Sequence, residues 1–152
     1  SLFAQYSDLH YTAEPVRNAE RWVAGAAYAH AFRAGDVVFA SAYGVSERTR
    51  DGDAPWLDFS GMGIRLGGQM TYGANTTFFA GGSVEHRHHG DEDPSFLKTR
   101  RETQYDLSLG ASYVPARYWR VTPKLSFTHN ASNTEINKYR RESVSVTIRR
   151  DF

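Results

Sequence analysis

The chain has 152 residues, a formal net charge of +1 and no cysteine, with a mean hydropathy of −0.57. This length fits one domain. The near-neutral charge gives no electrostatic reason for a nucleic-acid partner, and the lack of cysteine excludes disulfides and thiolate metal sites. No segment approaches the roughly 18 consecutive apolar residues of a membrane helix, which excludes a helical membrane protein but not membrane strands, in which only alternate residues face lipid.

The first half of the chain contains five segments predicted to be strands, because apolar side chains alternate with polar or small ones. They are residues 2–12, 21–32, 36–48, 61–72 and 75–87. The first has no clear parity. The third places Phe39 and Tyr43 on its apolar face and Ala40, Ala42 and Gly44 on the opposite face. We expect apolar faces to point outward and the small or polar faces to point inward.

Three more strands are predicted in the second half, over residues 101–114, 118–130 and 141–152. The first of them has the clearest pattern, in which Tyr105 and Tyr113 bracket Leu107, Leu109 and Ala111 on one face. Aromatic residues on either side of an aliphatic band are typical of a strand that crosses two membrane interfaces. No helical segment competes with these eight strands.

Short connections alternate with long ones along the chain. The short ones, at residues 33–36, 72–75 and 114–118, contain the Gly or Pro typical of turns. The longer polar ones lie at residues 12–18, 49–56, 88–100 and 129–140. Outer-membrane barrels have the same asymmetry, with tight periplasmic turns and longer external loops. The sequence therefore predicts an all-β protein, an antiparallel transmembrane β-barrel of the bacterial outer membrane over residues 1–152, with both termini periplasmic and the long loops extracellular. Because the chain starts with Ser1, we also expect a mature or trimmed product.

Two sets of side chains are candidate functional residues of such a barrel. Aromatic residues expected at the membrane interfaces are Trp22, Tyr28, Tyr72, Tyr105, Tyr113 and Trp119. Charged residues expected in the lumen are Arg65, Glu85, Arg87, Asp106, Lys124 and Arg149. The lumen charges can form a salt-bridged network or line a path for a polar substrate. The small inward residues can leave room for transport, or relieve crowding where strands curve.

Two clusters contain residue types that can carry chemistry. The segment with His86, His88 and His89, followed by Asp91, Glu92 and Asp93, contains metal-ligand types but no fixed ligand spacing, so we predict neither a metal site nor a cofactor. His129 and Ser132, with Glu135 and Glu142 nearby, could serve a lipid hydrolase at the barrel rim. A strand would point His129 and Ser132 to opposite faces, whereas a hydrolase needs its base and nucleophile in contact. We therefore do not expect an enzyme.

The end of the chain resembles known outer-membrane proteins. Val144, Val146, Ile148 and the terminal Phe152 resemble the C-terminal strand that the barrel-assembly machinery recognises, although Arg150 departs from the usual aromatic residue. Residues 97–152 resemble the end of barrels in the surface lipoprotein assembly modifier family. The matching positions are Pro115, Trp119, Val121 and Pro123 in a turn and strand, and Asn130, Ser132, Asn133, Tyr139 and Arg141 in the final hairpin.

This resemblance implies a function in export. Proteins of that family join a periplasmic helical-repeat domain to a larger barrel and help lipoproteins to reach the cell surface. The expected partners are outer-membrane lipids and lipopolysaccharide, the barrel-assembly machinery, and a lipoprotein or polymer cargo. The chain is then either part of a larger barrel or a shorter barrel with the same closing hairpin. The alternative function is a free-standing eight-stranded structural or adhesion-type barrel.

Overall fold

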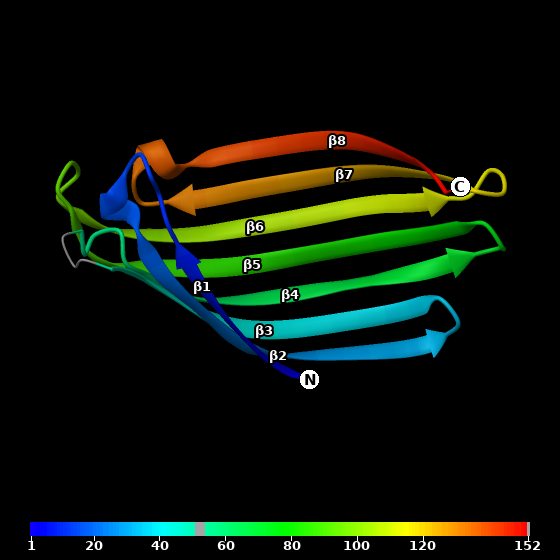
Figure 1. Ribbon diagram of the computed structural model, residues 1–152, viewed down its shortest axis with the longest axis horizontal. Coiled ribbons are helices and arrows are strands. Elements are labelled where there is room, and N and C mark those ends of the chain that lie inside the picture. Colours follow the sequence, from blue (N-terminus) through cyan, green and yellow to red (C-terminus); the bar gives the residue numbers. More distant parts are fainter. Residues whose placement is uncertain (51–53, 152) are drawn as a thin grey trace.

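The computed structural model describes residues 1–50 and 54–151, and its regular structure is almost entirely β-strand (Figure 1). The strands are β1 (Leu2–Leu9), β2 (Ala19–Arg33), β3 (Asp36–Thr49), β4 (Phe59–Tyr72), β5 (Thr76–Asp93), β6 (Lys98–Tyr113), β7 (Trp119–Ser132) and β8 (Tyr139–Arg150). Two short 3-10 helices, η1 (Pro15–Arg17) and η2 (Glu135–Asn137), lie in connections. Within the described residues, no helix is long and apolar enough to cross a membrane.

The eight strands form one antiparallel sheet in chain order, which confirms the predicted all-β class. The sheet is curved and twisted (Figure 1). Among the described residues, β1 pairs only with β2, and β8 pairs only with β7. The sheet is therefore open, and these strands do not form the closed ring that the barrel prediction requires.

The turns after β2, β4 and β6 lie at one end of the sheet (Figure 1). The other connections lie at the opposite end, and they include the long ones after β1, β3 and β7. Gly35 and Gly73 take positive φ values of 92° and 65° in two of the short turns, where the lack of a Cβ avoids strain. The predicted long loop at residues 88–100 is wrong for most of its length. There β5 and β6 extend until Asp93 lies opposite Lys98, with a register shift between His88 and Glu92. A polar hairpin can project into water while most of its backbone stays paired.

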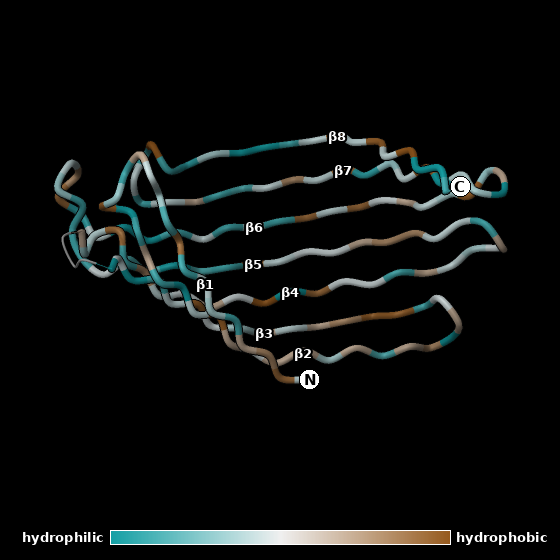
Figure 2. Tube along the Cα trace, in the orientation of Figure 1, coloured by the Kyte–Doolittle hydropathy of each residue, from teal (hydrophilic) through white to brown (hydrophobic). Residues whose placement is uncertain are grey.

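The outer face of the sheet carries the large apolar side chains. Leu107, Leu109 and their neighbours on β7 and β8 share this face, because residues directly opposite in an antiparallel pair point the same way. Val144 is 76% exposed, and the buried apolar residues of the described chain are only Ala19 and Ala54. In Figure 2, hydrophobic residues lie along the strands, and hydrophilic ones gather on β5 to β8 towards the long connections. The aliphatic side chains of these strands are therefore exposed on the outer face and are not buried in a core.

The predicted facing of β3 is wrong. Tyr28 lies opposite Ala40 and Trp22 lies opposite Ser46, so the alanines of β3 share the outer face with these aromatic residues. Phe39 and Tyr43 point to the inner face instead. Both faces of β3 carry apolar or small residues, so hydropathy alone cannot decide which face is outward, and the register with β2 decides it.

Four aromatic rings on the inner face lie over the glycine directly opposite on the neighbouring strand. The pairs are Phe3 with Gly25, Phe39 with Gly67, Tyr43 with Gly63, and Phe79 with Gly110. A methyl group added to any of these glycines would lie within 3.0 Å of the ring. At these positions the small inner residues relieve crowding, which was one of the two alternatives, and do not leave an empty passage.

Gly67→Ala is expected to destabilise the sheet, because its methyl group would meet both the Phe39 ring and the Ala80 carbonyl oxygen, 2.9 Å away. Overpacking of this kind costs about 1–3 kcal/mol. Gly44→Ala is the matched control, since its methyl group would meet only the Gly61 carbonyl oxygen at 3.8 Å. Chemical unfolding of the three proteins measures the difference, and equal unfolding free energies for both variants would contradict the role given to Gly67.

Candidate functional site

The inner face is the candidate functional site, because it gathers charges from five neighbouring strands. Arg65 lies opposite Ser83, which lies opposite Asp106, and Asp106 lies opposite Thr128. The same registers place Glu85, Arg87, Lys124 and Arg149 on this face. Arg149 forms an ion pair with Asp151 at 2.6 Å, near the end of the chain. The other charges fall into two groups, a paired cluster towards the long connections and a pocket further along the sheet.

The paired cluster is built around Phe59 at the start of β4. The Arg21 and Arg87 guanidinium groups lie 6.0 Å and 5.6 Å from the centre of its ring. Arg21 forms an ion pair with Glu47, and Arg87 forms one with Glu85 at 2.5 Å. The Tyr43 hydroxyl also donates a hydrogen bond to Glu85, at 2.5 Å. Each charge in this group is therefore matched by a neighbour.

His89, Arg100 and Glu102 extend the paired cluster beyond Tyr105, towards the long connections. The His89 side chain is 1% exposed and accepts a hydrogen bond at Nε2 from Arg100 Nε, at 2.9 Å. Arg100 Nε lies 3.5 Å from the Glu102 carboxylate. Burial acts to raise the pKa of Glu102, but His89 and the positive charges of Arg100 and Arg87 outweigh it and hold this pKa below its usual value. Glu102 therefore stays ionised although it is buried.

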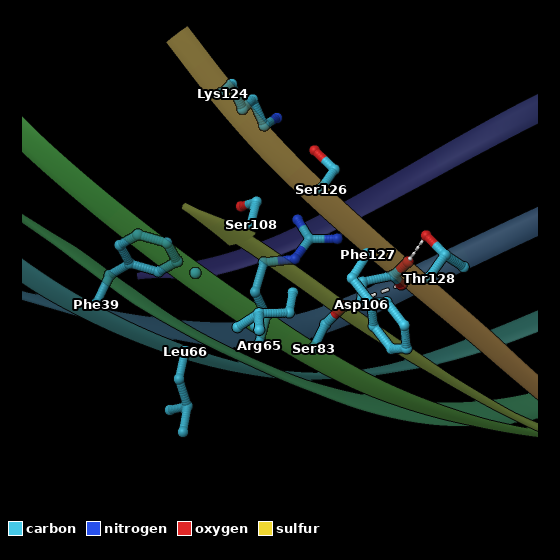
Figure 3. A pocket seen from close by; sticks show the side chains of 13 residues that line it. Phe39, Arg65, Leu66, Ser83, Asp106, Ser108, Lys124, Ser126, Phe127 and Thr128 are labelled. Carbon is cyan, nitrogen blue, oxygen red and sulfur yellow. Dashed lines mark hydrogen bonds between the residues drawn. The ribbon is translucent and has the colours of Figure 1, made fainter. Parts of the chain in front are cut away.

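The pocket has a volume of about 340 Å³ and is lined by residues from β3 to β7 (Figure 3). Arg65 extends from β4 towards Ser108 and Ser126, and Lys124 projects from β7 (Figure 3). Within the described residues, neither cation has a hydrogen bond or an ion pair.

Asp106 is the carboxylate that lines this pocket. It accepts hydrogen bonds from Thr128 Oγ1 at 2.7 Å, Gln104 Nε2 at 2.9 Å and Ser83 Oγ at 3.3 Å. Three uncharged donors thus hold the carboxylate in place.

The six predicted interface aromatics all lie on the outer face, and each is at least 40% exposed. The Trp22 ring packs on Tyr6 with centroids 4.9 Å apart, and the Arg150 guanidinium lies 5.4 Å from the centre of the Trp119 ring. Val144, Val146 and Ile148 of the predicted assembly signal follow one another on the outer face of β8. Phe152 lies outside the described residues.

The histidine-rich segment and the His129–Ser132 pair are each divided between the two faces of the sheet. His86 and His88 lie on the outer face, whereas His89 is buried on the inner face. In the described chain, no group of three His, Cys, Asp or Glu side chains could hold a metal ion. His129 stacks on Tyr105 outside, at 6.3 Å between ring centres, while Ser132 lies inside, 2.9 Å from the Thr134 hydroxyl. Their opposite orientation agrees with the three-residue spacing.

Sequence reasoning missed Phe59, His89, Arg100 and Glu102 as members of the site. Arg100 and Glu102 have the parity of Asp106, so extending the alternation backwards would have found them. The assignment of residues 88–100 to a loop hid this signal.

The lowered pKa of Glu102 predicts a pH dependence of stability. A carboxylate whose pKa is lower in the folded protein stabilises the fold above its unfolded pKa, and this contribution is lost as the pH falls through the folded pKa. On acidification from neutral pH to below pH ~4, the unfolding free energy of the wild type is expected to fall more steeply than that of Glu102→Gln. Parallel pH profiles of the two proteins would rule out this contribution.

A protein-family model described as surface lipoprotein assembly modifier matches residues 18–152 of the chain. The match extends from the start of β2 to the last residue. It confirms the resemblance and extends it well beyond residues 97–152. No curated protein and no solved structure matched the chain.

Proposed function

The chain belongs to the surface lipoprotein assembly modifier family, and we propose that it is an outer-membrane β-barrel segment of a system that delivers lipoproteins to the cell surface. The observation that carries the proposal is the two-faced sheet. Its outer face carries an exposed band of aliphatic and aromatic side chains, and its inner face combines charged and small residues with a few aromatic rings. Barrel strands in the outer membrane alternate in this way, because one face contacts lipid and the other a polar lumen.

The exposed apolar side chains of the outer face are favourable in a lipid bilayer but not in water. In water, exposed apolar side chains such as Met62, at 71%, and Val144 would promote association. In a bilayer, the same surface is solvated by acyl chains, and the six exposed aromatic residues lie at the headgroup levels. The long connections then face outward, where lipopolysaccharide surrounds them, and the short turns face the periplasm.

The unpaired edges of the sheet are evidence for a larger barrel. Within the described chain, the outer edges of β1 and β8 have no strand partner, and unpaired backbone groups cost several kcal/mol each in a bilayer. We infer that further strands complete the ring between these edges. A free-standing eight-stranded barrel would instead require β1 and β8 to pair directly.

The inner face does not support a hydrolytic function, because His129 and Ser132 point away from each other. Its matched ion pairs support a structural role near the long connections, and its open pocket supports contact with a passing polar chain. We therefore propose a translocation function in which the protein binds and guides its cargo without chemical conversion.

Loss of the gene that encodes this chain is expected to keep the cognate lipoprotein off the cell surface, because the proposed route across the outer membrane is then missing. Protease accessibility of the lipoprotein on intact cells measures this, with total lipoprotein and an unrelated surface barrel as controls. Normal surface display in the deletion strain would contradict the proposed function.

Cell fractionation followed by intact mass measurement tests the location and the larger barrel together. We expect the protein in the outer-membrane fraction at a mass several-fold above the 17.1 kDa of this chain. A mature protein near 17.1 kDa would instead favour the free-standing barrel, and recovery outside the membrane fraction would contradict the membrane location.

A further inference from the structure

We propose that the pocket on the inner face binds acidic segments of the polypeptide cargo, with Arg65 and Lys124 as the charged groups that recognise carboxylates. This inference rests on the proposed translocation function. It adds the chemistry of the cargo that the inner face prefers.

The first argument is a local surplus of positive charge. Arg65 and Lys124 line the pocket without an ion pair in the described part of the chain. Two more cations, Arg120 on β7 and Arg141 on β8, lie on the same face, opposite Arg149 and Thr128, and they too lack an ion pair there. The inner face is therefore cationic over β7 and β8.

The second argument is that the neighbouring acids are already occupied. Glu47, Glu85 and Glu102 are paired with Arg21, Arg87 and Arg100 in the paired cluster. Asp106 is held by three uncharged donors and forms no ion pair among the described residues. Asp106 keeps its negative charge, but the pocket lining contains two cations against this one carboxylate, so Arg65 and Lys124 remain available to an incoming anion.

The third argument is the supply of hydrogen-bond donors. The hydroxyl groups of Ser108 and Ser126 line the pocket beside Arg65 (Figure 3). In the described chain, neither side chain is bound to another protein group. A carboxylate accepts two parallel hydrogen bonds from a guanidinium group and further bonds from hydroxyls. The pocket thus offers what an Asp or Glu side chain binds.

The site is expected to bind its cargo weakly, as translocation requires, because the cargo has to dissociate again. Lys124 and Arg65 are both exposed, and exposed ion pairs contribute only about 0–1 kcal/mol each. Binding to an extended acidic segment is therefore weak and reversible, and it depends on salt because the charges are screened over about 10 Å at 0.1 M.

Binding of short labelled peptides to the full-length protein in detergent micelles tests the proposal by fluorescence anisotropy. One peptide alternates Asp with Ser, and the control peptides replace Asp with Asn or Lys. We expect only the Asp peptide to bind, and added salt to weaken it. Arg65→Gln combined with Lys124→Gln is expected to weaken binding about five- to tenfold.

The matched control is Arg48→Gln combined with Arg101→Gln, which removes the same charge from outer-face side chains that lie opposite Glu20 and His88. This variant is expected to bind the Asp peptide like the wild type. Arg65→Lys combined with Lys124→Arg keeps both charges and is expected to retain binding, which shows that the site survives substitution. Equal binding of the Asp and Asn peptides, or no loss in the double Gln variant, would overturn the proposal.

The anion site and the translocation function can be refuted independently of each other. Peptide binding that responds to Arg65 and Lys124, together with normal surface display in the deletion strain, would refute the translocation function and leave the anion site. Surface display that requires the protein, together with peptide binding that ignores both cations, would refute the anion site and leave the function.

Discussion

The register of the antiparallel strand pairs is the constraint on which the rest of this structure depends. A slip of one residue would move every side chain of a strand to the other face, and would turn Arg65 or Asp106 towards the surface that now carries Leu66 and Leu107. The same register places Phe39 and Phe79 directly over Gly67 and Gly110. The fit between ring and glycine in turn opposes a slip of two residues, which would keep the facing, because such a shift would place Phe39 opposite Arg65 or Gln69. Packing and pairing therefore support each other without a conventional core.

The inner face combines two different electrostatic environments. In the paired cluster, arginine and glutamate side chains satisfy one another around Phe59 and His89, so this end of the sheet is internally neutralised. In the pocket, Asp106 is bound by hydroxyl and amide donors, and the cations remain accessible. Ion pairs between neighbouring strands stabilise the sheet, whereas cations without an ion pair can bind an anionic group of a cargo. One region of the inner face therefore stabilises the sheet, and the other is the proposed binding site for cargo.

The open sheet and its apolar outer face lead to the same physical conclusion. A lipid environment solvates exposed leucine, isoleucine and valine side chains, but it provides no hydrogen-bond partner for a strand edge. In the proposed membrane location, an outer face suited to lipid and two unpaired edges in the described chain would require other strands to complete the ring.

The sequence by itself determined the eight strands, the short turns at residues 33–36, 72–75 and 114–118, and the family, because these depend on local patterns such as the Tyr105–Tyr113 alternation and the motif around Trp119. It also placed the faces of β4 to β8 correctly, since their polar and apolar residues differ clearly. Only the tertiary structure decided the facing of β3, where Ala40 and Phe39 are both acceptable to lipid and the pairing with Tyr28 breaks the tie. It also extended β5 and β6 through a predicted loop and brought His89 to Arg100. These contacts join residues on different strands, and local hydropathy contains no information about which strand positions lie opposite each other.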